Sequence, residues 1–259
     1  GPEDPLDGGI VDVFNSRRLR IFGPTKEAAQ IESSKAFAKN LMKEAKVPTA
    51  EFAVFNTPAA ALAHVRLRGV PIVIKASGLA LGKGVYVCHT FEEAERAISD
   101  IMILKVHKDA GSEVVIEEYL EGQEISVHAL SDGVTHLLFP ASQDHKRALD
   151  GDTGKNTGGM GTIAPMPWVT LEMMAGLESQ VVTPTLETLK KRGIQFKGLL
   201  FPGLMVTLSG PKVLEYNARF GDPETQAVLP RLESDLLPLL YGVAIADLER
   251  HVDACPLRW

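Results

Sequence analysis

The stretch LEYNARFGDPE at residues 214–224 combines a strand pattern with a set of chemically related polar side chains. Side chains alternate along a strand with a period of two, so Glu215, Asn217 and Arg219 are predicted to share one face. The opposite face carries the residues expected to pack into a core: Leu214, Tyr216 and Ala218. Carboxylate and amide oxygens are ligands that Mg²⁺ accepts together with phosphate oxygens, and the arginine would reach an anion beside them. The pattern alone also fits an edge strand with a solvated polar face.

The end of this stretch predicts the start of a helix. Asp222 is expected to cap that helix, with Pro223 and Glu224 in its first turn. A helix N-terminus carries partial positive charge, so it would add to the attraction of an anion near the polar face.

A second motif is the glycine loop GLALGKG at 78–84, between predicted strands at 71–75 and 84–88. The loop is not a Walker A motif, because its spacing is one residue short and a strand, not a helix, follows it. We interpret it as the tip of a hairpin whose backbone N–H groups close over phosphates. The cations Lys35, Lys75 and Lys83 would neutralise charge on a transferring phosphoryl group. Read alone, a glycine-rich hairpin is more often a simple turn.

Two further segments are rich in polar residues. EEYLEGQE at 117–124 is expected to leave one strand and enter another, so its backbone can face an adenine edge and Glu117 or Glu124 can accept from ribose hydroxyls. Without other support it is an acidic hairpin. DHKRALDGDTGKNTGGMG at 144–161 has no periodicity, and a loop this long in a compact domain is usually functional or disordered. His145 in that loop could act in acid–base chemistry or simply line a polar site.

Composition limits the function class. The chain has 259 residues and a formal net charge of −6, so nothing favours binding to nucleic acid. Its two cysteines, Cys88 and Cys255, form neither a zinc site nor a disulfide framework, which suits a cytoplasmic location. The longest apolar stretches are too short to span a bilayer. We expect no membrane partner and no nucleic-acid partner.

Predicted elements define the fold class. Helices are expected at 7–19, 26–46, 90–105 and 170–192, and strands at 20–22, 51–55, 113–120, 124–130, 134–140, 198–208 and 212–217, besides those named above. The class is therefore α/β or α+β, with a largely antiparallel second half.

Taken together, these motifs resemble the ATP-grasp enzymes and, within them, the phosphoribosylamine–glycine ligase family. The resemblance covers nearly the whole chain and is carried by these segments: GPEDPL at 1–6, IFGPT at 21–25, ESSKAFAK at 32–39, IVIKASGLALGKGV at 72–85, VIEEYLEGQEIS at 115–126, SQDHKR at 142–147, GDTGKNTGGMG at 151–161 and VLEYNARFGDPETQ at 213–226. It implies an ATP-grasp fold, in which two α+β subdomains clamp ATP. We expect a remnant of an N-terminal domain at 1–30, a lid subdomain with a preceding helix at 31–116 and a catalytic subdomain at 117–259, from a chain cut at both ends.

The resemblance also implies roles for individual residues. ATP phosphates would contact Lys35 and Lys75, with Gly78, Gly82 and Gly84 in the lid loop. The adenine and ribose would lie against Glu117, Tyr119, Leu120 and Glu124, and the metal would bind Glu215 and Asn217. The expected substrate-binding residues are Asp144, His145, Lys146, Asn156, Thr157, Arg219 and Asp222, and the expected catalytic residues are Lys75, Lys83, Arg219 and Asp144.

The implied reaction is the ATP-dependent ligation of glycine to 5-phosphoribosylamine through glycyl phosphate, with Mg²⁺ or Mn²⁺. This route needs no protein nucleophile, and the sequence shows no Ser–His–Asp or Cys–His pattern. The partners would be these small molecules, and the chain a monomer or a weak homodimer. Two alternatives stay open: another ATP-grasp ligase or carboxylase, and a catalytically incomplete nucleotide-binding fragment.

Overall fold

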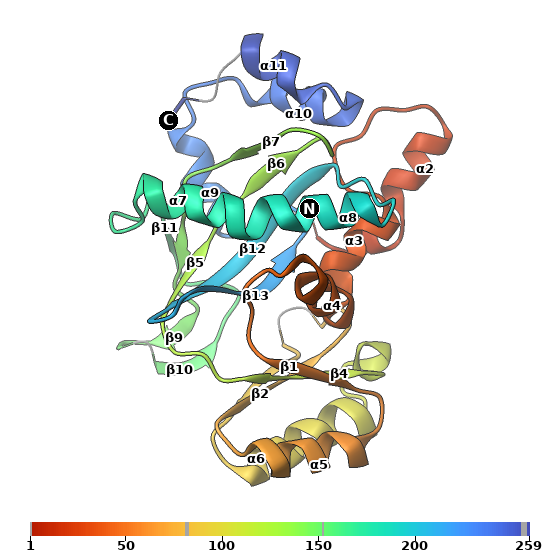
Figure 1. Ribbon diagram of the computed structural model, residues 1–259, viewed down its shortest axis with the longest axis vertical. Helices are drawn as coiled ribbons and strands as arrows, with labels where there is room; N and C mark the ends of the chain where they lie inside the picture. The colour runs from red at the N-terminus through yellow and green to blue at the C-terminus, as the bar shows by residue number, and fades with distance from the viewer. Residues whose placement is uncertain (1, 81–82, 152, 255–257) are drawn as a thin grey trace.

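Two antiparallel sheets, one small and one large, organise the computed structural model, which describes residues 2–80, 83–151, 153–254 and 258–259. The small sheet and its two helices form one end of the molecule, and the large sheet lies in the middle (Figure 1). This arrangement confirms the predicted α+β class with largely antiparallel strands in the second half. Within the described residues, no helix is both long enough and apolar enough to cross a membrane.

The small sheet has the strand order β1-β4-β2-β3: β1 Phe52–Phe55, β4 Val114–Glu118, β2 Ile72–Ala76 and β3 Val85–Cys88. Helices α5 (Pro58–Arg68) and α6 (Phe91–Ile98) cover one face (Figure 1). Alternation sends Ile72 and Ile74 into the core under these helices, while Lys75 turns to the other face. The predicted glycine hairpin is confirmed, because β2 and β3 pair from Ile72↔Cys88 to Lys75↔Val85.

The large sheet is built on its longest strand, β12 (Gly198–Thr207). One side of β12 pairs with β13 (Gly210–Asn217), and the other side pairs with β6 (Ala129–Ser131) and then β5 (Gln123–Ser126), while β7 (His136–Leu138) pairs with β6. Its apolar core also takes in α3 (Lys26–Ser33), α4 (Lys35–Ala45), α7 (Leu171–Leu177) and α8 (Thr183–Lys191). Figure 1 shows α7 and α8 crossing in front of this sheet.

The polar segment 142–162 is more ordered than the sequence suggests. It forms two short ladders, β8 (Gln143–Asp144) with β11 (Thr162–Ile163), and β9 (Arg147–Leu149) with β10 (Thr153–Asn156). The prediction of a structureless loop was wrong because such short polar strands carry no hydrophobic alternation. Positive backbone angles, which glycine tolerates, occur at Gly151 in the turn between β9 and β10 (φ 71°) and at Gly154 within β10, where the register is irregular (φ 83°).

Other boundaries differ from the predictions. The expected helix at 26–46 is two helices, because Ser34 is extended (φ −136°) and its hydroxyl caps α4 through Phe37 N. The expected strand at 20–22 is absent, and the strand at 124–130 divides into β5 and β6. The first predicted helix is α1 (Asp4–Asp7) and α2 (Ile10–Ser16), and π-helical turns at Ser99–Ile103 and Glu178–Val182 follow α6 and α7. Short 3₁₀ turns occupy Lys108–Gly111 and Leu229–Arg231, and α9 (Glu224–Val228), α10 (Leu236–Ile245) and α11 (Leu248–Ala254) complete the elements.

Candidate active site

A cavity of about 1550 Å³ lies between the two sheets. Its walls come from β2 and β3 of the small sheet, from the connection between β4 and β5, and from one face of the large sheet. Most residues predicted for the site line it: Lys35, Lys75, Gly84, Glu117, Tyr119, Leu120, Glu124, Asp144, His145, Lys146, Thr157, Glu215, Asn217, Arg219 and Asp222. Segments far apart in the sequence therefore meet in one place.

A few predicted residues lie elsewhere. Gly78 is not in the cavity wall, and it packs against Ala110, whose Cα would lie 2.6 Å from an added Cβ. Lys83 is exposed and outside the wall. Gly82 and the side chain of Asn156 lie outside the described part of the chain.

The floor of the cavity is a row of directly opposed residues on the large sheet. Glu215 pairs with Gly203, Gly203 with Ser126, and Ser126 with Ser142. Opposed residues of an antiparallel sheet place their side chains on one face. Gly203 contributes no side chain, so the row is open above β12.

Strand β13 differs in one respect from its predicted alternation. Tyr216 and Ala218 are buried in the core, as predicted. Leu214 is only partly buried and lines the cavity, so that prediction was wrong. The reason is a β-bulge between Gly203 and Leu204, which leaves Leu214 without a register partner. Its carbonyl accepts instead from Lys75 Nζ at 3.1 Å.

Four cations surround the Glu215 carboxylate. Burial acts to raise the pKa of Glu215, but Lys146, Lys35, Lys75 and Arg219 outweigh burial, so the pKa lies below its ordinary value. Burial lowers the pKa of Lys35, although Glu215 opposes that effect. Glu215 therefore stays ionised in a site where an isolated carboxylate would not.

A buried ion cluster lies between the two sheets, and it contains a lysine that the sequence analysis missed. The ammonium groups of Lys39 and Lys75 both lie 3.0 Å from the Glu117 carboxylate. Lys39 Nζ also donates to Thr49 Oγ1 at 2.7 Å, and that hydroxyl donates to Val213 O at 2.6 Å. Burial, reinforced by Lys75, lowers the pKa of Lys39 to about 8 against the opposing effect of Glu117. Its spacing of four residues from Lys35 on α4 is the signal that could have found it.

Lys35 ties α4 to the glycine loop. Its Nζ donates to Gly78 O at 3.4 Å, and its backbone N–H donates to Ser77 O at 2.7 Å. At the opposite wall, Lys146 Nζ lies 3.3 Å from Glu124 Oε2, and both side chains are partly exposed. The Tyr119 ring meets His89 edge-on, with centroids 5.6 Å apart.

The N-terminal part of the chain holds Arg219. Its Nε lies 3.1 Å from Glu32 Oε1 and 3.3 Å from Glu3 Oε2. Glu32 Oε2 also accepts from Ala218 N at 2.8 Å. Burial raises the pKa of Glu32, and Arg219 opposes that shift. The guanidinium group is therefore held by two carboxylates just beyond the C-terminal end of β13.

Asp222, His145 and Thr157 occupy the rim. Asp222 does not cap a helix, and that prediction was wrong: Pro223 holds the cap position of α9, and Asp222 Oδ1 accepts from Gln226 Nε2 at 2.7 Å. His145 is exposed, with Nδ1 3.2 Å from Gly161 O. The Thr157 hydroxyl donates to Lys146 O at 2.9 Å and accepts from Gly159 N at 3.1 Å.

Asp144 and Glu224 form a carboxylate pair near the far end of the floor. Burial raises the pKa of Asp144 to about 6, with help from Glu224 and against Lys146. Glu224 is 4% exposed and was not predicted as a site residue. Its Oε1 accepts from Ser126 Oγ at 3.1 Å. A Cβ at Gly221 would lie 2.9 Å from Phe201 Cε1 and closer still to Glu224 Oε2, so a larger residue there would force these side chains to shift.

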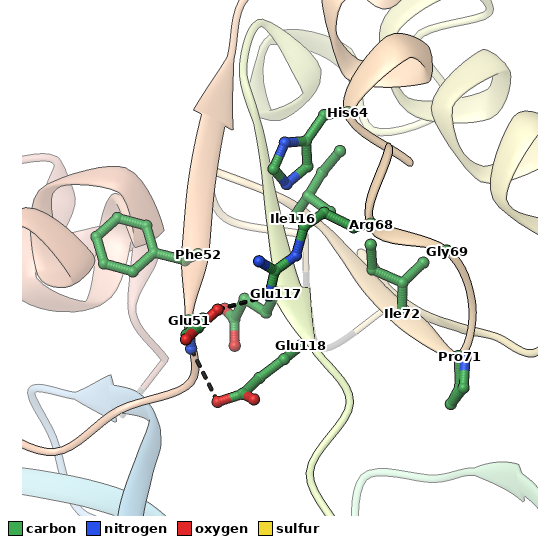
Figure 2. A pocket seen from close by; sticks show the side chains of 10 residues that line it. All are labelled: Glu51, Phe52, His64, Arg68, Gly69, Pro71, Ile72, Ile116, Glu117 and Glu118. Carbon is green, nitrogen blue, oxygen red and sulfur yellow. Dashed lines mark hydrogen bonds and ion pairs between the residues drawn. The ribbon is translucent and has the colours of Figure 1, made fainter. Parts of the chain in front are cut away.

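A second, smaller cavity of about 160 Å³ opens on the small sheet (Figure 2). Its polar groups already bond one another: Arg68 pairs with Glu51, and Glu51 N donates to Glu118 Oε1 at 3.0 Å. Glu118 in turn pairs with Lys212 at 2.7 Å. This cavity therefore offers a ligand much less than the large one does.

The donor set at the floor suits a metal that is shared with a ligand. Across the described ranges, no three His, Cys, Asp or Glu side chains are grouped to hold a metal ion by themselves. Glu215 and Asn217 supply two hard oxygen donors. Mg²⁺ is commonly bound by one or two carboxylates plus phosphate oxygens and water, so these residues fit that mode.

Comparison with known proteins agrees with this geometry. Residues 33–225 match the model of the phosphoribosylglycinamide synthetase ATP-grasp (A) domain, and residues 1–32 match the N domain of the same synthetase. The chain belongs to the phosphoribosylglycinamide synthetase family. Its curated relatives include the phosphoribosylamine–glycine ligase of Xanthomonas campestris, which is 50% identical over 260 residues, covering 100% of this chain and 59% of the relative. The enzyme of that name from Halalkalibacterium halodurans is 51% identical, covering 94% of this chain and 57% of the relative.

This member of the synthetase family also resembles solved structures. Phosphoribosylamine–glycine ligase from Thermotoga maritima superposes with a TM-score of 0.79 at 37% identity, covering 87% of this chain and 57% of that one. The biotin carboxylase domain of Hydrogenobacter thermophilus 2-oxoglutarate carboxylase, a complex with MgADP, shares the fold with a TM-score of 0.72 at 20% identity, covering 90% and 50%. The chain thus spans little more than half the length of the relatives it matches.

Proposed function

We propose that this chain forms the ATP-binding and ligating core of an enzyme that joins glycine to 5-phosphoribosylamine, giving glycinamide ribonucleotide, ADP and phosphate in de novo purine biosynthesis. The observation that carries the proposal is Glu215, an ionised carboxylate surrounded by four cations at the floor of the cavity. A metal–triphosphate complex needs both oxygen ligands and neutralising cations. The names of the relatives support the choice of substrates.

ATP would lie between the two sheets. Lys35 and Lys75 would contact its phosphates, and the loop 78–84 would close over them, although Leu81 and Gly82 lie outside the described residues. Glu117, Tyr119 and Leu120 would face the adenine, and Glu124 would accept from the ribose. The support is that these side chains share one wall of the cavity. The related biotin carboxylase domain is a complex with MgADP.

Glu215 and Asn217 would hold Mg²⁺, or Mn²⁺ in its place, together with phosphate oxygens. The bound metal would neutralise charge on the triphosphate. An oxygen of the glycine carboxylate attacks the γ-phosphorus, and the bond to the bridging oxygen breaks to release ADP. The amine of 5-phosphoribosylamine then attacks the carbonyl carbon, the bond from carbon to the phosphate oxygen breaks, and phosphate leaves as the nitrogen loses a proton.

In these steps the protein's side chains would bind the substrates and neutralise the negative charge of the phosphoryl group. Lys75 and Arg219 would stabilise the negative charge of the transferring phosphoryl group, with Lys83 arriving on the closed loop. Asp144 would act at the amine end. The substrates would also be contacted by His145, Lys146, Asn156, Thr157 and Asp222.

The test is ADP release by the intact polypeptide, followed in a coupled assay. Release should require both glycine and 5-phosphoribosylamine, and hydroxylamine should trap glycyl phosphate as a hydroxamate when the amine is omitted. At a Mg²⁺ concentration that saturates the wild type, Glu215→Gln should strongly reduce release, while Glu187→Gln, an exposed acid on α8 outside the cavity wall, should not. ADP formation indifferent to glycine would favour another ATP-grasp ligase or carboxylase. Nucleotide binding in calorimetry without turnover would favour an incomplete nucleotide-binding fragment.

We also propose the division into 1–30, 31–116 and 117–259, a monomer or weak homodimer in solution, and a cytoplasmic location. The separate apolar cores of the two sheets support the boundary near residue 116, while α4 of the proposed lid subdomain packs in the core of the large sheet. Sedimentation velocity of the intact polypeptide checks the oligomeric state.

A further inference from the structure

Two buried ammonium groups share one carboxylate in the wall of the large cavity. Lys39 Nζ and Lys75 Nζ each lie 3.0 Å from the Glu117 carboxylate, and none of the three side chains is more than 7% exposed. The pKa of Lys39, which burial lowers to about 8, still leaves its ammonium group protonated at pH 7. With both lysines charged, the three side chains hold two positive charges and one negative charge, so one positive charge is left unbalanced.

The ammonium group of Lys39 is enclosed by protein. It donates to Thr49 Oγ1 at 2.7 Å, and the Thr49 hydroxyl in turn donates to Val213 O at 2.6 Å. The centroid of the Phe52 ring lies 5.8 Å from Lys39 Nζ. The side chain borders the cavity but is only 2% exposed, so its ammonium group has little freedom to follow a ligand.

Lys75 has different surroundings. Besides its ion pair with Glu117, its Nζ donates to Leu214 O at 3.1 Å, and both Lys75 and Leu214 line the cavity. An anion in the cavity can draw Lys75 away from Glu117 only if another cation still balances the carboxylate, because a buried carboxylate without a counter-ion is strongly unfavourable. Lys39 is the cation in place to do so.

We propose that Lys39 is a positioning residue that serves as the permanent counter-ion of Glu117 and so releases Lys75 to bind the phosphates of ATP, an inference that rests on the proposed function. Lys39 acts through Glu117 and does not itself contact the nucleotide. Without Lys39, Lys75 would be the only partner of Glu117, and the three positions would carry no net charge to attract a triphosphate.

The experiment compares two affinities of the intact polypeptide at pH 7, measured by calorimetry: that for a non-hydrolysable ATP analogue with Mg²⁺, and that for adenosine in competition with it. Their ratio, which we call the phosphate gain, isolates what the phosphates add to binding. Lys39→Met keeps the length of the side chain without its charge. It should reduce the phosphate gain roughly 10- to 100-fold, the size expected for a hydrogen bond to a charged group. Adenosine affinity should stay within about twofold, which also reports that the variant is folded.

A second comparison separates positioning from direct contact. In a Glu117→Gln background there is no carboxylate to balance, so adding Lys39→Met should change the phosphate gain less than about fivefold. The double variant should therefore bind phosphates better than Lys39→Met alone, because Lys75 again carries an unbalanced positive charge. If Lys39 contacted phosphate itself, its replacement would cost the same roughly 10- to 100-fold in both backgrounds, and the proposal would be wrong. This comparison stands even if Lys39→Met alone fails to fold.

Lys43→Met is the matched control, since Lys43 is exposed one turn further along α4, and its phosphate gain should equal that of the wild type. An unchanged phosphate gain in Lys39→Met would overturn this proposal while leaving the proposed function intact. An equal loss of affinity for adenosine and for the analogue would also overturn it, because that result indicates a purely structural role. Wild-type protein that binds the analogue no better than adenosine would overturn the proposed function as well.

Discussion

Replacing Asp144 with asparagine should make the protein more stable at neutral pH. The pKa of Asp144 is raised from 3.8 to about 6, chiefly by burial. In the unfolded chain the group ionises near its ordinary value, so between pH 4 and 6 the folded state holds more protons. Stability from this group is therefore lost as the pH rises through that window. Asparagine has the same shape without the charge.

The size of the effect follows from the shift. A raised pKa of about two units corresponds to roughly 3 kcal/mol in the free energy of unfolding. Asp144 is only partly buried, so solvent screening reduces this to about 1.5 kcal/mol. Asp144→Asn should gain that amount at pH 8, and the gain should fall towards zero near pH 4.

Urea unfolding of wild type, Asp144→Asn and the exposed control Asp150→Asn at pH 8, 6 and 4.5 measures the difference. An Asp144→Asn variant that is equal or less stable at pH 8, or whose advantage persists unchanged at pH 4.5, would refute the reasoning.

Three further outcomes are expected. Glu117→Gln should lower the free energy of unfolding by about 3–5 kcal/mol without nucleotide, because it removes the counter-ion of two buried ammonium groups, Lys39 and Lys75. In the same urea experiment Glu118→Gln should cost under about 1 kcal/mol, because its ion pair with Lys212 is partly exposed. Gly159→Ala should reduce glycine-dependent turnover far more than Gly158→Ala: Gly159 has φ +135° and its Cβ would lie 2.5 Å from Pro223 Cδ, while Gly158 has open space. Glu215→Gln should raise the Mg²⁺ concentration needed for half-maximal ADP release at least tenfold, and an unchanged Mg²⁺ curve would remove Glu215 from the metal site.

Local pattern was enough to predict much of the fold. Period-two alternation indicated the strand that carries Glu215 and Asn217, and the glycine spacing indicated the β2–β3 hairpin. Neither prediction needed knowledge of distant partners, because alternation and turn chemistry are properties of short segments.

What the sequence could not supply was register. Glu215, Ser126 and Ser142 belong to segments far apart in the chain, and only the pairing of strands places them in one row. The bulge that turns Leu214 to the cavity arises in the same way, from a mismatch between two strands. Lys39 was missed because a lysine on a helix is usually solvated, and only tertiary packing buries this one.

The floor row fixes the distance between Glu215 on β13 and Ser142 beside β5. Glu215 and Ser142 are separated by three strand-to-strand steps of about 4.8 Å each, so roughly 14 Å of backbone ladder lies between these two residues. Backbone hydrogen bonds between the strands set this distance, so a side-chain substitution does not change it. If the proposed reaction takes place along this row, a change of amino-acid substrate would have to come from the β8–β11 and β9–β10 ladders and from α9, because the strand spacing beneath them stays the same.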